Sequence, residues 1–178
     1  MAIDCAQALA SPLMQQIIRV ESGGNPFAIG VVGDALQRQP KNETEAVATS
    51  RMLEARGFNY SIGIGQVNKV HFPRLGWVAD LPKGFNDCQN VLAATDILLV
   101  CQTRATNAGY STHPHFTTVD GVKASAADVA ALSCYYSGDL RAGTRLGYPA
   151  KVLRGISMPD APGGRGKTAA NEFLMMAD

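Results

Sequence analysis

The chain has 178 residues, of which 46% are hydrophobic and 17% are charged, and its formal net charge is +1 at pH 7. This length and balance are typical of one globular domain with a sizeable core, and they exclude an intrinsically disordered protein. The near-neutral charge disfavours nucleic acid or an anionic membrane as the main partner, and no apolar run reaches the roughly 18 residues of a membrane span.

The first element that the sequence predicts is an amphipathic helix, which begins at Ser11-Pro12 and ends before Gly23-Gly24. A capping hydroxyl and a proline suit the first turn of a helix, and glycine commonly ends one. Glu21 continues the apolar stripe of this helix into its last turn. Such a glutamate is ordinarily a solvated residue. Burial and the negative end of the helix dipole would instead both raise its pKa, which a general acid working near neutral pH requires.

Two further elements follow this helix. Residues 27–37 are typical of a short hairpin that turns at Gly33-Asp34. Asn42 together with Glu45 predicts the start of a helix of about four turns, which closes at Gly57.

Residues 60–68 are rich in glycine and β-branched residues and predict a strand or a tight turn. Alternating glycines let a backbone pass close to a ligand, and Gln66 and Asn68 offer amide donors and acceptors. The ordinary alternative is a bulged strand without a ligand. No Gly-Lys-Ser/Thr ending follows, which argues against a phosphate loop.

The second half of the chain is predicted to be helical. Asp87 is predicted to cap the longest helix, which runs to about residue 107. Ser125 and Asp128 form a capping box for another helix that ends near Gly138, and a short helix surrounds residues 148–153. The segment Leu132–Gly138 contains two adjacent tyrosines. Tyrosines at a helix end can form the wall of a sugar site, or they can simply pack in the core or at its rim.

The four cysteines form no Cys-x-x-Cys pair, and the three histidines have no metal spacing. We therefore expect no metal site and no cofactor. Free core thiols and two disulfides in an oxidising compartment are both compatible with this pattern. The N-terminus carries no signal-peptide pattern, so the sequence fits either the mature part of an exported protein or a cytosolic protein.

Several short motifs occur in order over residues 12–155 and together resemble the lytic transglycosylase family. The family pattern begins with a Glu-Ser pair, continues with a Ser-x-Gly-x-x-Gln element and an Asn at a helix start, and ends with two tyrosine motifs. The matching residues are Glu21, Ser22, Asn25, Pro26, Ala28, Ser61, Gly63, Gln66, Asn90, Val91, Ser133, Tyr135, Gly138, Tyr148 and Val152. The insertion of residues 29–58 and the Gln66-Val67-Asn68 ending resemble the transglycosylase component of type IV secretion systems most closely.

This resemblance implies an α+β, mainly helical, lysozyme-like fold of the goose-type or soluble lytic transglycosylase kind, with a small β element. It implies a catalytic domain over residues 1–156, with residues 157–178 as a C-terminal tail or linker. It also implies a periplasmic monomer that acts on peptidoglycan glycan strands and works with type IV secretion system proteins.

The resemblance assigns the catalytic acid and base to Glu21 alone, in a mechanism in which the substrate assists. It assigns substrate contacts to Ser22, Ser61, Gly63, Gly65, Gln66, Asn68, Asn90, Tyr135 and Tyr148. By analogy with the family fold, it also implies the disulfides Cys88–Cys134 and Cys5–Cys101.

Tyr136 departs from the family pattern, which has an asparagine at this position that helps to shape the site. Two alternatives stay open beside the transglycosylase. One is a lysozyme-like muramidase that uses water, and the other is a catalytically silent module that binds peptidoglycan or assembly proteins.

Overall fold

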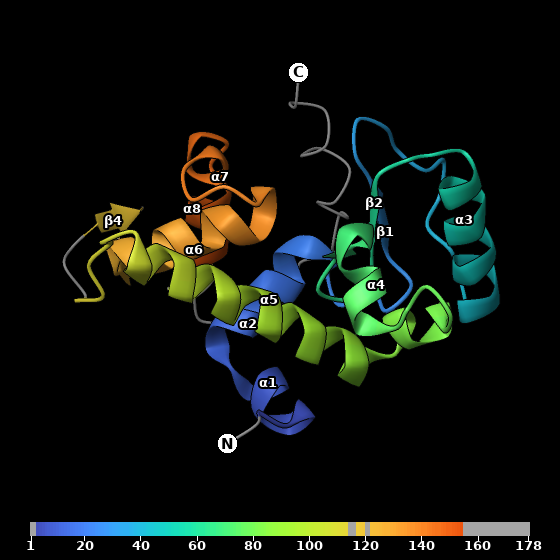
Figure 1. The fold of residues 1–178 in the computed structure, drawn as a ribbon, viewed down its shortest axis with the longest axis horizontal. Helices are drawn as coiled ribbons and strands as arrows, with labels where there is room; N and C mark the ends of the chain where they lie inside the picture. Colours follow the sequence, from blue (N-terminus) through green and yellow to red (C-terminus); the bar gives the residue numbers. More distant parts are fainter. Residues whose placement is uncertain (1–2, 114–116, 120–121, 155–178) are drawn as a thin grey trace, which may run out of the picture. The chain divides into compact units, whose positions relative to one another are not determined.

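The computed structural model describes residues 3–113, 117–119 and 122–154. The described residues form two compact units. The first unit contains residues 3–10 and 17–94, and the second contains residues 11–16 and the described chain from residue 95 onward. The predicted mainly helical fold with a small β element is confirmed (Figure 1). The predicted tail, residues 157–178, lies outside the described residues.

The helix α2 (Pro12–Glu21) carries the predicted catalytic residue at its end. It follows a shorter helix, α1 (Cys5–Ala10), that the sequence did not reveal. The Ser11 hydroxyl accepts a hydrogen bond from the Met14 backbone N–H (3.4 Å), and Ile17 of the apolar stripe is fully buried. Gly23, with φ +61°, turns the chain away immediately after the helix. Both predicted ends of this helix are therefore confirmed.

Three short strands form an antiparallel sheet in the first unit, in the order β1 (Ile29–Val31), β2 (Tyr60–Ile62) and β3 (Val67–Asn68). The predicted hairpin over residues 27–37 is wrong in its pairing. The chain does turn at Gly33, but the return is a single bridge, and β1 pairs instead with β2. The physical reason is the side chain of Gln39, whose amide bonds both the N–H of Ile29 (2.8 Å) and its carbonyl (3.0 Å). A side chain thus occupies the edge that a return strand would need.

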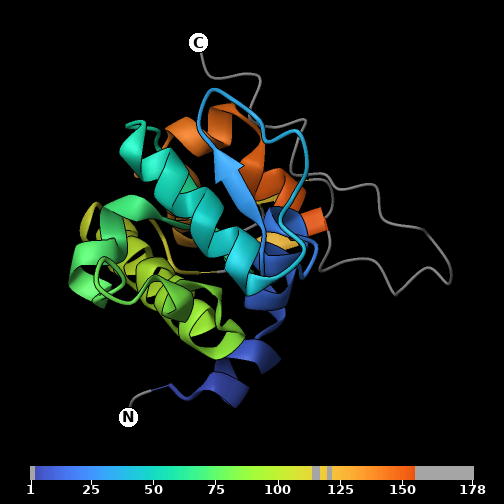
Figure 2. The same cartoon turned by 90° about the vertical axis from the view of Figure 1, so that its right-hand side faces the viewer.

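The helix α3 (Glu43–Ala55) lies beside this sheet (Figure 1, Figure 2). As predicted, Asn42 caps it by accepting a hydrogen bond from the Glu45 N–H (2.9 Å), and the chain leaves it at Gly57 with φ +76°. The turns that follow the sheet were not predicted. They are η1 (Lys69–His71), α4 (Phe72–Leu75) and η2 (Leu81–Phe85), and η2 contacts α3.

The long helix α5 (Asp87–Asn107) has the predicted extent. Its capping residue was predicted wrongly, because the side chain of Asn86 rather than Asp87 accepts the hydrogen bond from the Gln89 N–H (3.0 Å). Asp87 is the first helical residue, where its negative charge still suits the helix dipole.

The second unit has a helical core and a small hairpin. The predicted capping box of Ser125 and Asp128 opens α6 (Ala126–Ser137), and α7 (Ala142–Arg145) and α8 (Tyr148–Arg154) pack against α6. The strands β4 (Thr117–Val119) and β5 (Val122–Ala124) pair with each other and contact α8. The sequence did not predict this hairpin.

All four cysteines form disulfides, but both predicted pairings are wrong. Cys5 pairs with Cys88 (Cα–Cα 5.4 Å), and Cys101 pairs with Cys134 (Cα–Cα 5.6 Å). The reason is the position of α1, which places Cys5 at the first turn of α5 beside Cys88. Cys101 lies further along α5 and faces the last turn of α6, which carries Cys134.

None of the helices in the described part of the chain combines the length and the apolar character that crossing a bilayer requires.

Candidate active site

The end of α2 and the glycine-rich turn between β2 and β3 are joined by the residue after Glu21. Glu21 is the last residue of α2 and is partly buried. The hydroxyl of the buried Ser22 donates a hydrogen bond to the Ile64 carbonyl (2.8 Å) and accepts one from the Gly24 N–H (3.1 Å). Ser22 therefore fixes the backbone next to Glu21 against the glycine-rich turn.

The turn itself is held by the side chain of Gln66. Gln66 is in the left-handed region (φ +49°), the only residue other than glycine to be so in the described chain. Its side-chain amide donates to the carbonyls of Ala28 (3.0 Å) and Gly63 (2.9 Å), and the Gly63 N–H donates to the same Ala28 carbonyl (2.9 Å). The amide group of Gln66 thus stabilises the loop after α2 and the glycine-rich turn together.

Asn90 connects the same turn to the first part of α5. Its side chain is fully buried, donates to the carbonyls of Ile62 (2.9 Å) and Gly84 (2.8 Å), and accepts a hydrogen bond from the Gly65 N–H (2.7 Å). A Cβ at Gly63 would overlap the Asn90 side chain and would approach the Gly84 carbonyl to 2.6 Å. The close packing of Asn90 against the turn is therefore the physical reason for glycine at position 63.

Ser61 and Asn68 face each other across the pair of strands β2 and β3. The side-chain amide of Asn68 donates to the hydroxyl of Ser61 (3.2 Å) and to the side chain of Asn59 (3.0 Å). Both Ser61 and Asn68 are partly buried, so part of each side chain remains accessible.

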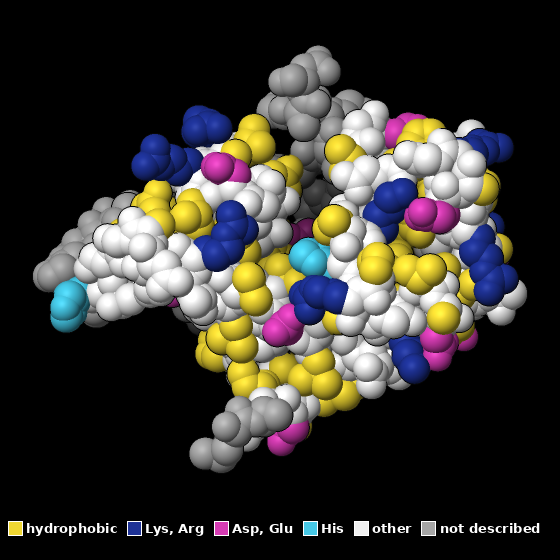
Figure 3. All heavy atoms as spheres, viewed as in Figure 1, with side chains coloured by type: hydrophobic (Ala, Val, Ile, Leu, Met, Phe, Trp, Pro, Cys, Tyr) yellow, Lys and Arg dark blue, Asp and Glu magenta, His cyan; other side chains and the backbone are white. Residues whose placement is uncertain are grey.

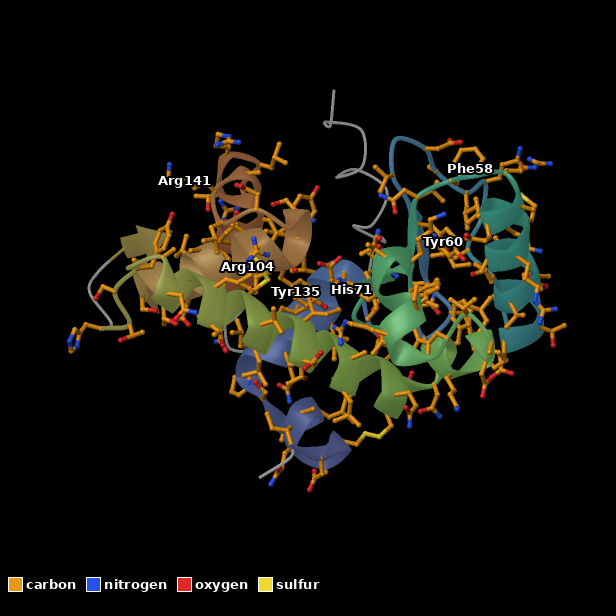
Figure 4. All side chains as sticks on the ribbon, viewed as in Figure 1. Phe58, Tyr60, His71, Arg104, Tyr135 and Arg141 are labelled. Atoms are coloured by element: carbon orange, nitrogen blue, oxygen red, sulfur yellow. A yellow bond between two sulfur atoms is a disulfide. The ribbon has the colours of Figure 1, made fainter. Side chains whose placement is uncertain are left out.

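The neighbouring Tyr60, labelled in Figure 4, belongs to the core of this unit. Its ring packs edge to face against Phe72 with centroids 5.9 Å apart. Burial, and to a lesser degree the carboxylate of Glu54, raises the pKa of the Tyr60 hydroxyl well above its ordinary value, so this group stays protonated.

In the second unit, the last turn of α6 brings two tyrosines together with a third from α8. Tyr136 stacks on the fully buried Tyr148 with ring centroids 4.7 Å apart and an interplanar angle of 20°. Tyr135, also in this turn and labelled in Figure 4, is partly buried. The aromatic ring at position 136 is therefore accommodated by stacking on Tyr148.

Ser133 and Gly143 stabilise the turn that follows these tyrosines. The hydroxyl of the buried Ser133 donates to the Asp139 carbonyl (2.7 Å), and a Cβ at Gly143 would approach the Ser133 carbonyl to 2.8 Å. No sequence signal points to Gly143, because the segment that it packs against is ten residues away in the chain.

Arg104 of α5 is a second residue that sequence reasoning missed. Its guanidinium group donates to the Gly138 carbonyl (3.0 Å) and to the Cys134 sulfur (3.2 Å), beside the Cys101–Cys134 disulfide. The only available signal was its position in the last turn of a long helix, which is common for an arginine.

Two other acids that could serve as a second carboxylate have different roles. Glu54 is exposed and forms an ion pair with Lys69 (3.2 Å). Asp139 is exposed and accepts hydrogen bonds from the backbone N–H groups of Arg141 (2.8 Å) and Ala142 (2.7 Å). Within the described residues, no group of three or more His, Cys, Asp or Glu side chains could hold a metal ion.

Comparison with known proteins identifies one matching family and several relatives. The family model described as "Transglycosylase SLT domain" matches residues 2–149. The chain is 38% identical over 162 residues to proteins named "Type IV secretion system protein virB1" from Brucella abortus, Brucella melitensis and Brucella suis. The alignment covers 90% of this chain and 63% of each relative, so the chain spans a little under two thirds of their length. No solved structure matches the chain.

Proposed function

The chain belongs to the transglycosylase SLT-domain family, and from this premise we propose that it is a lytic transglycosylase that cleaves peptidoglycan glycan strands. The observation that carries the proposal is the placement of Glu21. This carboxyl group lies at the end of an amphipathic helix, and the residue after it is hydrogen-bonded to a glycine-rich turn with a fixed backbone. A rigid support of this kind is what a group that must both give and take a proton needs.

The proposed reaction uses one carboxyl group twice. Glu21, in its acid form, protonates the oxygen that links N-acetylmuramic acid to N-acetylglucosamine, and the β-1,4 glycosidic bond breaks. The N-acetyl oxygen of the substrate stabilises the positive anomeric carbon, as in the substrate-assisted glycosidases. The carboxylate of Glu21 then removes the proton of the muramoyl 6-hydroxyl, whose oxygen closes the 1,6-anhydro ring. Glu21 returns to its acid form, and no water is consumed.

The remaining site residues are proposed to bind and orient the sugars. In the first unit, the partly buried Ser61 and Asn68 would contact N-acetyl groups, while Ser22, Gln66 and Asn90 hold the surrounding backbone, including the buried Gly65, through the hydrogen bonds described above. In the second unit, Tyr135 would contact a sugar of the strand, and Tyr148, with Tyr136 stacked on it, would support this aromatic surface.

We place the activity in the periplasm, in a monomeric domain over residues 1–156 with residues 157–178 as a C-terminal tail or linker. The names of the Brucella relatives support a role beside a type IV secretion system, where local opening of the cell wall would allow the assembly of the secretion machinery. The disulfides Cys5–Cys88 and Cys101–Cys134 fit an oxidising compartment.

The test is digestion of purified peptidoglycan in water enriched in ¹⁸O, followed by mass spectrometry of the products. We expect new ends that carry 1,6-anhydro-muramic acid and contain no ¹⁸O, because the muramoyl 6-hydroxyl attacks in place of water. Reducing ends with one ¹⁸O atom would contradict the proposal and identify a muramidase. If no product forms while the protein still binds glycan, the chain is a silent binding module.

A further inference from the structure

Three arginines gather where α6 ends and α7 begins, all within the second unit. Arg104 bonds the carbonyl of Gly138, which ends α6, while Arg141 and Arg145 lie at the two ends of α7. Arg104 and Arg141 are labelled in Figure 4, and dark blue side chains surround a magenta one on this face in Figure 3. All three arginines are exposed, so the cluster Arg104–Arg141–Arg145 faces solvent.

Asp139, the acid of this turn, does not neutralise the cluster. Its carboxylate accepts the backbone N–H groups of Arg141 and Ala142, and these two bonds, followed by the charges of Arg145 and Arg141, hold its pKa below the ordinary value. Among the described residues, neither Arg104, Arg141 nor Arg145 forms an ion pair within 4.0 Å. The three guanidinium groups thus outnumber the one carboxylate of this turn, whose charge acts together with those of Arg141 and Arg145, and the surface stays positive.

Two of the guanidinium groups are oriented by neutral acceptors. Arg104 donates to the Gly138 carbonyl and the Cys134 sulfur, and Arg141 Nε donates to the Tyr110 hydroxyl (3.2 Å). Each guanidinium has five N–H groups, so several remain available to an anion after these bonds. A planar guanidinium group binds a carboxylate through paired hydrogen bonds. An arginine side chain that is already oriented but not neutralised loses less conformational entropy when it binds a carboxylate.

We propose that the cluster Arg104–Arg141–Arg145 binds the free carboxylates of the peptides attached to muramic acid. The inference rests on the proposed function, because it extends the substrate from the glycan to the peptide-bearing strand. Sugar rings carry no charge for this cluster to bind, whereas the attached peptides carry carboxylates. The last turn of α6 supplies both Tyr135, proposed to contact the sugar, and Gly138, which Arg104 binds. A strand held at Tyr135 would therefore place its peptides on the arginine side of this helix end.

Binding is the direct test, and Glu21→Gln prevents consumption of the polymer. The Glu21→Gln protein is titrated with fluorescent glycan strands whose peptides keep their free carboxylates and with the same strands after these carboxylates have been converted to amides. We expect about fivefold to tenfold tighter binding of the strands with free carboxylates at low salt. Adding Arg141→Gln and Arg145→Gln should reduce this preference to about twofold or less, and about 0.5 M NaCl should do the same.

Arg51→Gln with Arg56→Gln in the Glu21→Gln protein is the matched control, because it removes the same charge from exposed positions in the first unit. It should leave the preference intact. Arg145→Gln alone keeps the Arg141–Tyr110 hydrogen bond and should lower the preference in part. The inference is overturned if the Glu21→Gln protein binds both kinds of strand equally well. It is also overturned if the preference survives the loss of Arg141 and Arg145, which is the result expected if the cluster binds an acidic protein instead. An equal loss in the control would also overturn it. Failure of the wild type to cleave either polymer would count against the proposed function, and the binding result would still decide the inference.

Discussion

At the scale of single residues, the site depends on close packing between Gly63 and the buried side chain of Asn90. The backbone at position 63 lies so close to this side chain that only glycine fits there. Asn90 supplies three hydrogen bonds to the backbone of this region, and its side chain occupies the space where a Cβ of residue 63 would lie. Hydrogen bonds to buried backbone groups are costly to lose, because each unpaired group has given up its water. The position of the glycine-rich turn relative to α2 is therefore sensitive to small changes at residues 63 and 90.

Gly63→Ala and Gly57→Ala form a matched pair that separates this contact from backbone strain. Both glycines have nearly the same positive φ (+77° and +76°), but a Cβ at Gly57 meets nothing within 4 Å. We expect Gly57→Ala to lower the free energy of unfolding by about 1 kcal/mol from strain alone. Gly63→Ala should lower it by about 3 kcal/mol or more, because it also displaces Asn90. Urea denaturation measures both, and equal losses would contradict the proposed contact.

The sequence identified most of the residues of this network but could not predict their partners. Gln66 and Asn90 were expected to contact the substrate, and the structure shows the amide of each bonded to backbone carbonyls of the first unit. An amide donates and accepts equally well toward a ligand or toward the backbone. Only the three-dimensional packing decides whether the amide bonds a ligand or the backbone, so residue type and spacing were not sufficient to predict its partner.

At the scale of elements, the helices could be predicted from short sequence patterns. The contacts between distant segments could not be predicted from these patterns. The ends of the helices could be predicted because they depend on residues close together in the sequence. Asn42 and Ser125 cap α3 and α6, and glycines follow α2 and α6. The pairing of β1 with β2 joins segments about thirty residues apart, with the whole of α3 between them. The amide of Gln39 at the edge of β1 could not be anticipated from spacing alone.

The disulfides are the strongest of these nonlocal links and give a direct test. Cys5–Cys88 closes 83 residues and Cys101–Cys134 closes 33. The chain-entropy relation predicts losses of about 4.5 and about 3.7 kcal/mol for the paired Cys→Ser variants, with the longer loop costing more. Urea denaturation of each double variant measures these losses. Peptide mapping without reduction should yield only these two pairs, and a fragment that links Cys88 to Cys134 would contradict the structure.

At the scale of the whole molecule, the family and the mainly helical fold could be predicted because the motifs occur in order along most of the chain. The family model covers residues 2–149, which include both the Glu21 segment and the Tyr135 segment. The hairpin β4–β5 and the short turns after β3 could not be predicted, because their segments lack a strong periodic pattern. The presence of Tyr136 in place of the family's asparagine could be seen in the sequence. Its stacking on Tyr148 could not, because it depends on how α8 packs against α6.

A single carboxyl group, that of Glu21, is proposed to be both the acid and the base. The most direct measurement is the rate of release of 1,6-anhydro-muropeptides by the wild type, by Glu21→Gln and by Glu54→Gln. Loss of general acid–base catalysis predicts a rate lower by about 10²–10⁴-fold for Glu21→Gln. Glu54→Gln, which removes an exposed acid of the same unit, should remain close to the wild type. A Glu21→Gln protein of unchanged fold that keeps most of the wild-type rate would contradict the assignment of Glu21 as the acid and base.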